Sequence, residues 1–174
     1  MNPTLYPPEL PRQMRSKYIN NIGRVKQRFK KKKKIFSSSI LIYILVEMSD
    51  KVKYELEFPI QASPNMLYQY ISSASNLSEW FADNVNSRGK VFSFFWDGVE
   101  EKAELLSSKN NTYVKFKWLE NDDDCFFEIK ITVDEITKDV SLIIIDFADN
   151  DEVEEAKMLW ESQISDLKSV IGSS

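Results

Sequence analysis

The sequence predicts an α+β domain in which a curved antiparallel sheet of about six strands wraps around a long C-terminal helix. Three observations predict this fold: short runs that alternate apolar and charged residues, turn residues between those runs, and one long amphipathic segment at the end. The predicted order is one strand, two short helices, five strands and the long helix. Only a strongly curved sheet buries one face of every strand together with the apolar stripe of that helix.

The first strand and the two short helices follow Met48. Residues 51–60 alternate strictly between charged and apolar side chains, which is typical of a half-buried strand. Ser63-Pro64 supplies an N-cap and a proline at the first helical position. Asn76, with Glu79 three residues later, approximates the capping box of a second short helix.

Turn residues separate five further predicted strands between Lys90 and Phe147. Asp97-Gly98 is the strongest short-range hairpin signal in the chain, and Asn110-Asn111 and the acidic run 121–124 indicate two more turns. Consecutive hairpins of this kind make an antiparallel meander. The alternating runs lie within residues 90–96, 103–105, 114–118 and 127–133, whereas the last strand, 140–147, is apolar on both faces, so that one side is expected to meet a helix.

The last segment predicts one long helix. Acidic and capping residues at 149–152 suit the positive end of a helix dipole, and Gly172 stands where a C-cap is expected. An apolar stripe with spacings of three or four runs along it. This order of elements is the helix-grip arrangement. The stripe consists of Val153, Ala156, Trp160, Ile164, Leu167 and Ile171.

The composition excludes several kinds of site. The 174 residues include no His, a single Cys and only four Gly. Without His there is no catalytic triad that uses imidazole and no His-ligated zinc or haem. One Cys excludes internal disulfides and cysteine-cluster metal sites, and the scarcity of glycine excludes the glycine-rich phosphate loops. We therefore expect no metal and no cofactor.

Charge divides the chain into a basic head, residues 1–47, and an acidic body, residues 48–174. The head holds eleven basic and two acidic residues, whereas the body holds 12 basic and 25 acidic ones. A body that acidic repels phosphate, so nucleic-acid binding is not expected. The uncharged stretch 35–46 would span about 18 Å as a helix against about 30 Å of hydrocarbon, which argues against a membrane span. The cytoplasm is the expected location.

Three interpretations of the head remain open. Met48-Ser49-Asp50 has the form of an ordinary start, so the head can be non-native sequence upstream of the domain. A basic stretch before a short apolar one also has the general form of a targeting or anchoring segment, although no small-residue cleavage site follows. The third interpretation is a tail that is solvated or that makes loose contact with nucleic acid.

Four short motifs stand in a characteristic order along the body of the chain. They are Ser63-Pro64, Trp80-Phe81, Trp96-Asp97-Gly98, and Trp160 followed by Leu167-Lys168. Together with the order of elements they resemble the START-like superfamily of lipid-transfer, pollen-allergen and polyketide-cyclase domains. Within it, the similarity is greatest to the branch that includes the C-terminal domain of the activator of the ninety-kilodalton heat-shock chaperone. The resemblance covers about residues 50–172.

The resemblance implies a cavity between sheet and last helix that holds a small apolar, aromatic or lipid-like molecule. The same aromatic side chains can instead fill the interior completely, and the sequence does not decide between these alternatives. Polar groups that can face the cavity are Glu101, Asp146 and Gln163, and no catalytic residue is assigned. The expected lining is Trp80, Phe81, Phe92, Phe94, Trp96, Phe116, Trp118, Phe127, Ile129, Trp160 and Ile164.

Three functions remain, in order of preference. The first is a carrier or sensor that binds a small apolar ligand without chemistry. The second is a protein-interaction module that resembles the chaperone activator, with a chaperone as partner. The third is an enzyme of cyclase or hydrolase type, in which a buried carboxylate acts as general acid or base.

Overall fold

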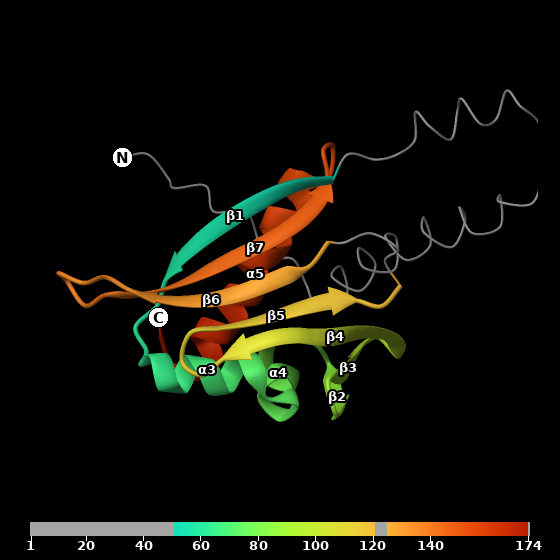
Figure 1. Ribbon diagram of the computed structural model, residues 1–174, viewed down its shortest axis with the longest axis horizontal. Helices are drawn as coiled ribbons and strands as arrows, with labels where there is room; N and C mark the ends of the chain where they lie inside the picture. Colours follow the sequence, from blue (N-terminus) through green and yellow to red (C-terminus); the bar gives the residue numbers. More distant parts are fainter. Residues whose placement is uncertain (1–50, 121–124, 174) are drawn as a thin grey trace, which may run out of the picture. The chain divides into compact units, whose positions relative to one another are not determined.

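The computed structural model describes residues 51–120 and 125–173 (Figure 1). The expectations about the head, residues 1–47, and about the acidic turn 121–124 lie outside the described residues. The elements in chain order are β1 (Lys51–Pro59), α3 (Pro64–Ser72), α4 (Ala74–Trp80), β2 (Asn84–Arg88), β3 (Val91–Trp96), β4 (Val99–Lys109), β5 (Tyr113–Trp118), β6 (Phe127–Val133), β7 (Val140–Asp149) and α5 (Val153–Ile171).

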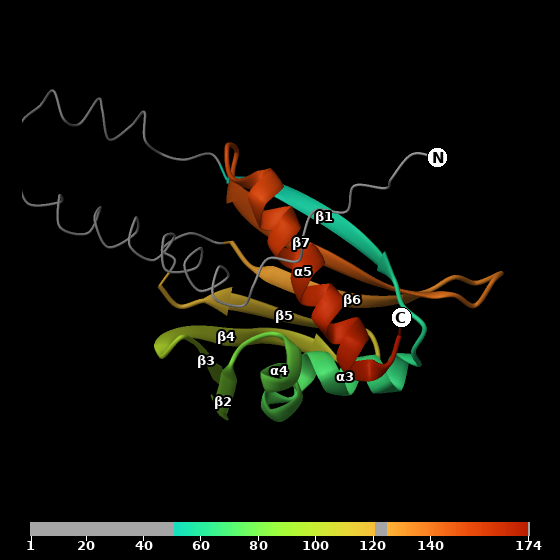
Figure 2. The same ribbon diagram turned by 180° about the vertical axis from the view of Figure 1, so that it is seen from behind.

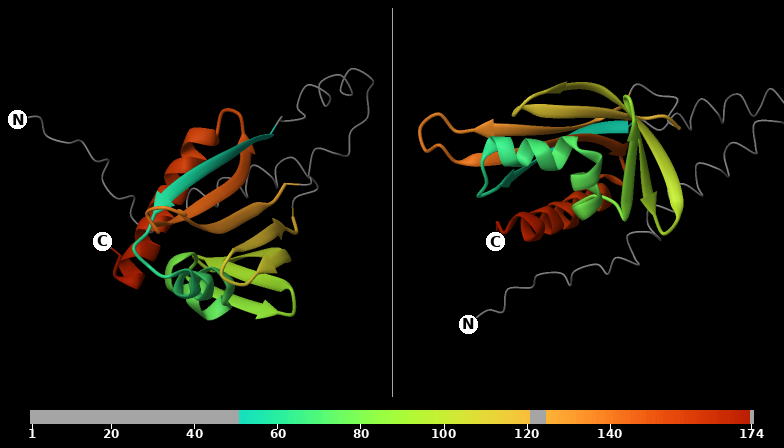
Figure 3. Two further views of the ribbon diagram at one scale, coloured as in Figure 1. Left: turned by 60° about the vertical axis from the view of Figure 1, so that its left-hand side comes forward. Right: turned by 90° about the horizontal axis from the view of Figure 1, so that it is seen from below.

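Within the described residues, one antiparallel sheet of seven strands, in the order β1-β7-β6-β5-β4-β3-β2, forms the body of the domain. The helix α5 lies across one face of this sheet (Figure 2). The strands bend around that side, as the turned views show (Figure 3). The predicted α+β helix-grip fold is therefore confirmed. We call the face toward α5 the inner face and the opposite one the outer face.

Local sequence explains where these elements begin and end. The side chain of Ser63 accepts a hydrogen bond from the backbone N–H of Met66, and Pro64 opens α3, as predicted. Asp97 and Gly98 have φ angles of 48° and 77°, the two positive values that a tight hairpin of the mirror-image type requires. Gly172 adopts the left-handed conformation with φ 70° and ends α5.

Three details differ from the prediction. The strand β2 was not expected, because Asn84–Arg88 is polar and only its Val85 is buried. The N-cap of α4 is Ser73 and not Asn76, since the Ser73 hydroxyl accepts from the Asn76 N–H. Glu152 is the N-cap of α5 and makes no side-chain capping bond, while Glu154 and Glu155 place negative charge in the first turn, near the positive end of the helix dipole.

The alternation of each strand places the hydrophobic core on the inner face. Phe94 on β3, Phe116 on β5 and Ile144 on β7 are fully buried, whereas their chain neighbours are partly exposed. On α5, the buried residues are Trp160, Gln163, Ile164 and Leu167. In the described part of the chain, no helix is both long enough and apolar enough to cross a membrane.

Candidate functional site

Phe81 lies at the centre of the interior, immediately after α4. Helix α4 begins at the Ser73 cap and carries Leu77 and Trp80 into the core, which fixes the position of the ring that follows. The ring of Phe81 therefore contacts rings from α4, the sheet and α5. Its centroid lies 5.3 Å from those of Trp80 and Phe94, 5.7 Å from that of Trp160, 5.9 Å from that of Phe127 and 6.0 Å from that of Trp96.

The remaining predicted lining rings join the same network from neighbouring strands. Phe116 stacks on Phe127 at 5.1 Å, and the Phe92 ring meets the Phe116 ring edge-on at the same distance. Trp118 stacks on Phe127 at 5.1 Å and meets Phe94 at 5.4 Å. Offset and edge-to-face contacts at these distances are the favoured arrangements of aromatic pairs. We call this network, together with buried Ile129 and Ile164, the aromatic cluster.

The backbone carbonyl of Phe81 is a polar point inside the aromatic cluster. It accepts hydrogen bonds from the indole of Trp96 at 3.1 Å and from the side-chain amide of Gln163 at 3.4 Å. Gln163 is only 5% exposed. The prediction that Gln163 borders the interior is thus consistent with its place on α5, where it ties the helix to the end of α4. A buried amide of this kind needs such a partner, because an unsatisfied one is costly.

Asp146 on β7 is the second polar point, and it links three elements. Its Oδ2 accepts from the Tyr54 hydroxyl of β1 at 3.2 Å and from the Trp160 indole of α5 at 2.9 Å. Its Oδ1 accepts from the backbone N–H of Phe147 at 2.8 Å. The sheet pairs Tyr54 directly with Asp146, which brings the two side chains to the same face.

Burial raises the pKa of Asp146 above the usual carboxyl value. The hydrogen bonds from Trp160, Phe147 and Tyr54 and the charge of Lys51 act in the opposite direction but do not cancel it. Burial, and then the charge of Asp146, also raise the pKa of Tyr54, so its hydroxyl keeps the proton that it donates. The result is a carboxyl group held by three fixed donors, which suits hydrogen bonding to a polar ligand group.

Glu101 stands apart from these two points. It lies on β4 opposite Phe94 and is half-buried on the inner face, as its strand parity predicted. The structure therefore places all three predicted polar groups on elements that bound the interior, and it shows Asp146 bonded to Trp160 of α5 and Gln163 bonded to the Phe81 carbonyl. Sequence reasoning missed Tyr54 as a partner of Asp146. The signal was present, since both residues have inward parity on strands at one sheet edge.

Comparison with known proteins identifies the fold family. A family model described as a START-like superfamily domain matches residues 48–173. A solution NMR structure from Bacteroides fragilis is 35% identical, covers 70% of this chain and 91% of its own, and has a TM-score of 0.52. The Aha1 dimer from Colwellia psychrerythraea is 16% identical, with a TM-score of 0.58 over 67% of this chain and 93% of its own.

A putative protein of the dynemicin biosynthetic locus has a similar fold at 17% identity and a TM-score of 0.56, over 71% of this chain and 48% of its own. No curated protein matches the chain. At these low identities the second and third structures support the fold alone.

Proposed function

Because the chain belongs to the START-like superfamily, we propose that it binds a small hydrophobic, aromatic or lipid-like molecule between the inner face of the sheet and α5. The observation that carries the proposal is the composition of the interior: a continuous aromatic cluster with two polar points, the Phe81 carbonyl and the Asp146 carboxylate. Sites for small apolar molecules combine such a lining with a few fixed polar groups.

The ring contacts set a condition on binding. Since Phe81 already touches rings on the sheet and on α5, a ligand must take the place of these contacts by turning rings or by shifting α5. A flat aromatic or elongated apolar molecule replaces ring contacts with equivalent ones and regains the stabilisation of burial. A ligand hydroxyl or amine would find an acceptor at Asp146.

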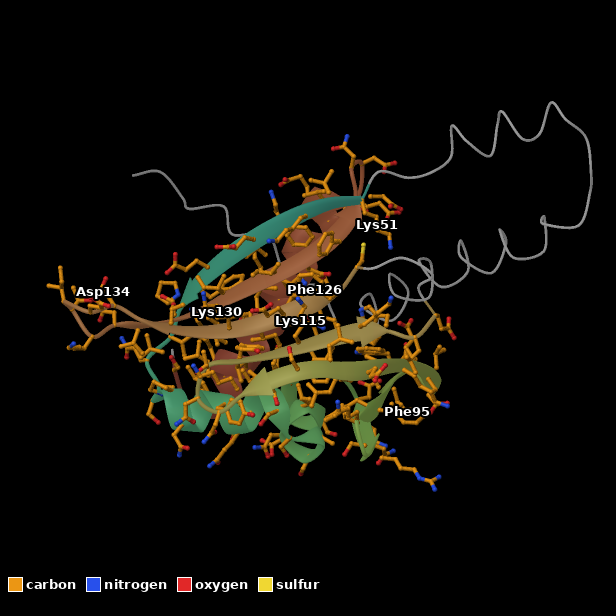
Figure 4. All side chains as sticks on the ribbon, in the orientation of Figure 1. Lys51, Phe95, Lys115, Phe126, Lys130 and Asp134 are labelled. Carbon is orange, nitrogen blue, oxygen red and sulfur yellow. The ribbon has the colours of Figure 1, made fainter. Side chains whose placement is uncertain are left out.

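Intrinsic fluorescence is a direct test, because all four tryptophans of the protein belong to the aromatic cluster. Titration with fatty acids, sterols and flavonoids is expected to change this fluorescence saturably for at least one class, with a Kd well below millimolar. Phe81→Leu should weaken that binding about tenfold or more. The matched control is Phe95→Leu, because Phe95 has outward parity on β3 (Figure 4). No saturation below millimolar with any class would contradict the proposal.

A protein-interaction role is the second candidate, and the outer face favours it. Phe126, Ile143, Ile145 and Phe147 form a half-buried apolar strip there, which we call the outer strip. The Lys115 ammonium lies 3.4 Å from the centre of the Phe126 ring, and the Phe126 and Phe147 rings meet at 5.1 Å (Figure 4). Apolar side chains bordered by charge are typical of interaction surfaces.

The test of this second role is a pull-down with a purified heat-shock chaperone ATPase, the partner that the family resemblance suggests. Binding should be lost in Phe126→Ser and retained in Phe81→Leu, the opposite of the pattern expected for ligand binding. We also propose a cytoplasmic location for either role, which fractionation of the protein's own cells would test.

A further inference from the structure

The strand β1 forms one margin of the sheet, since it is first in the strand order and pairs only with β7 among the described strands (Figure 1). The N–H of Ile60 donates to the Val140 carbonyl at 2.9 Å, which continues the register that pairs Pro59 with Ser141. Antiparallel bonding alternates along a strand. Even-numbered residues of β1 therefore bond toward β7, and the odd-numbered ones direct their backbone groups to the outer edge.

The charges of β1 follow an unusual order. Lys51 and Lys53 come first and Glu55 and Glu57 follow, all with side chains on the outer face. Charges on an edge strand normally prevent pairing with another strand. In β1 the order of charges instead favours pairing in one arrangement, because the strand is complementary in charge to an antiparallel copy of itself. With the two copies centred on Tyr54, Lys53 stands opposite Glu55, and Lys51 opposite Glu57.

We propose that two copies of this chain associate through antiparallel pairing of their β1 strands about Tyr54, which joins the two sheets into one. The symmetry of the pair repeats each Lys–Glu pairing twice. The residues that meet across the edge are the odd-numbered ones, whose backbone N–H and C=O groups already point outward. On the inner face the same register sets Val52, which is 40% exposed, opposite half-buried Leu56 of the other copy.

The charge order also disfavours the competing registers. The proposed register makes four Lys–Glu pairs, whereas sliding the copies by two residues leaves two and places either Lys53 opposite Lys53 or Glu55 opposite Glu55. In-register parallel pairing places every charge opposite its like. Like charges directly opposite each other destabilise a strand pair. Lys53, Glu55 and Glu57 are exposed, and no ion pair within residues 51–120 and 125–173 uses them. They are therefore available to a second copy.

Sedimentation equilibrium of the full chain over a range of concentrations tests the proposal. A monomer–dimer equilibrium is expected that shifts toward monomer as salt is raised, because salt screens exposed ion pairs. Lys53→Glu should weaken the dimer about tenfold or more, since it places Glu opposite Glu55 twice. The double variant Lys53→Glu/Glu55→Lys restores opposite charges and should recover the wild-type Kd to within about threefold. Lys130→Glu, in the middle of the outer face, is the matched control and should leave the dimer intact.

A mixing experiment separates this edge from any other interface. The variant with Lys51 and Lys53 both changed to Glu, and the variant with Glu55 and Glu57 both changed to Lys, should each be monomeric alone and form a heterodimer when mixed. Amide exchange at Lys53 and Glu55 should slow as wild-type concentration rises. A wild-type chain that stays monomeric at millimolar concentration would overturn the proposal, and so would a dimer that Lys53→Glu does not weaken.

Discussion

The same strands make both faces of the curved sheet, yet the side chains on the two faces are stabilised by different kinds of contact. On the inner face, rings from strands and helices contact one another at 5.1–6.3 Å, and residues such as Phe94 and Phe116 are fully buried. On the outer face, contacts are pairwise, as between Lys115 and Glu128 at 4.0 Å or Lys115 and Phe126. A shared network makes each inner residue costly to remove, whereas an outer residue affects one or two neighbours.

The largest expected effect is that of Trp160→Ala on the inner face. The substitution removes ring contacts with Phe81 and Phe127 and one donor to Asp146. We expect the free energy of unfolding to fall by about 3 to 5 kcal/mol, measured by urea denaturation. Phe126→Ala on the outer strip is the comparison and should cost about 1 to 2 kcal/mol, since that ring is only half-buried. Equal losses would show that the two faces do not differ as described.

The second prediction concerns the charge inside the inner face. Burial raises the pKa of Asp146, so the folded state holds this proton to higher pH than the unfolded state. The contribution of this carboxyl to stability is therefore largest at low pH and is lost as pH rises through its raised pKa. Thermal midpoints of wild type and Asp146→Asn should be measured from about pH 4 to pH 7. As pH rises over this range, the midpoint of Asp146→Asn should increase relative to that of wild type. Exposed Asp151→Asn serves as control, and a difference that stays constant with pH would contradict the prediction.

The third prediction compares one pair on each face by double-mutant cycles. The Phe81–Phe94 ring pair, changed singly and together to Leu, should show a coupling energy of about 0.5 to 1.5 kcal/mol. The Lys115–Phe126 pair, with Lys115→Met and Phe126→Leu, should show about 0.5 to 1 kcal/mol. Adding 0.5 M salt should leave the first value unchanged. Salt also weakens the Lys115–Glu128 ion pair. The Lys115–Phe126 coupling must therefore be measured separately in a Glu128→Gln background.

The same contrast explains what the sequence could predict. Strict alternation and the Asp97-Gly98 turn identified the inner residues of five strands, because burial imposes a period of two on a strand. The strand β2 escaped because one buried residue, Val85, leaves no period to detect. Tyr54 belongs to the apolar side of the alternating run 51–60, but its bond to Asp146 depends on the pairing of strands that are distant in sequence, and periodicity carries no information on that pairing.

The smallest expected effect lies farthest from the interior, in the turn between β6 and β7. The Asp134 side chain accepts hydrogen bonds from the backbone N–H groups of Ile136 and Thr137, both at 2.8 Å. These bonds lower the pKa of Asp134, and the bond from Thr137 makes the largest contribution. Its contribution is therefore present above the ordinary carboxyl pKa and is lost as pH falls through the lowered value, the reverse of Asp146.

Carboxyl-carbon NMR titration of the two aspartates measures this contrast directly. Asp134 should titrate below the ordinary range and Asp146 above it. Asp134→Ala should leave the global thermal midpoint nearly unchanged, because Ile136 at the tip of this turn is 91% exposed and the turn carries none of the core. The amides of Ile136 and Thr137 should nevertheless exchange faster in that variant, since they lose their acceptor. The contrary outcome is that the pKa values of both aspartates lie on the same side of the ordinary carboxyl range. In that case the inner face does not desolvate Asp146, and its carboxyl does not differ from that of Asp134 in the exposed turn as described.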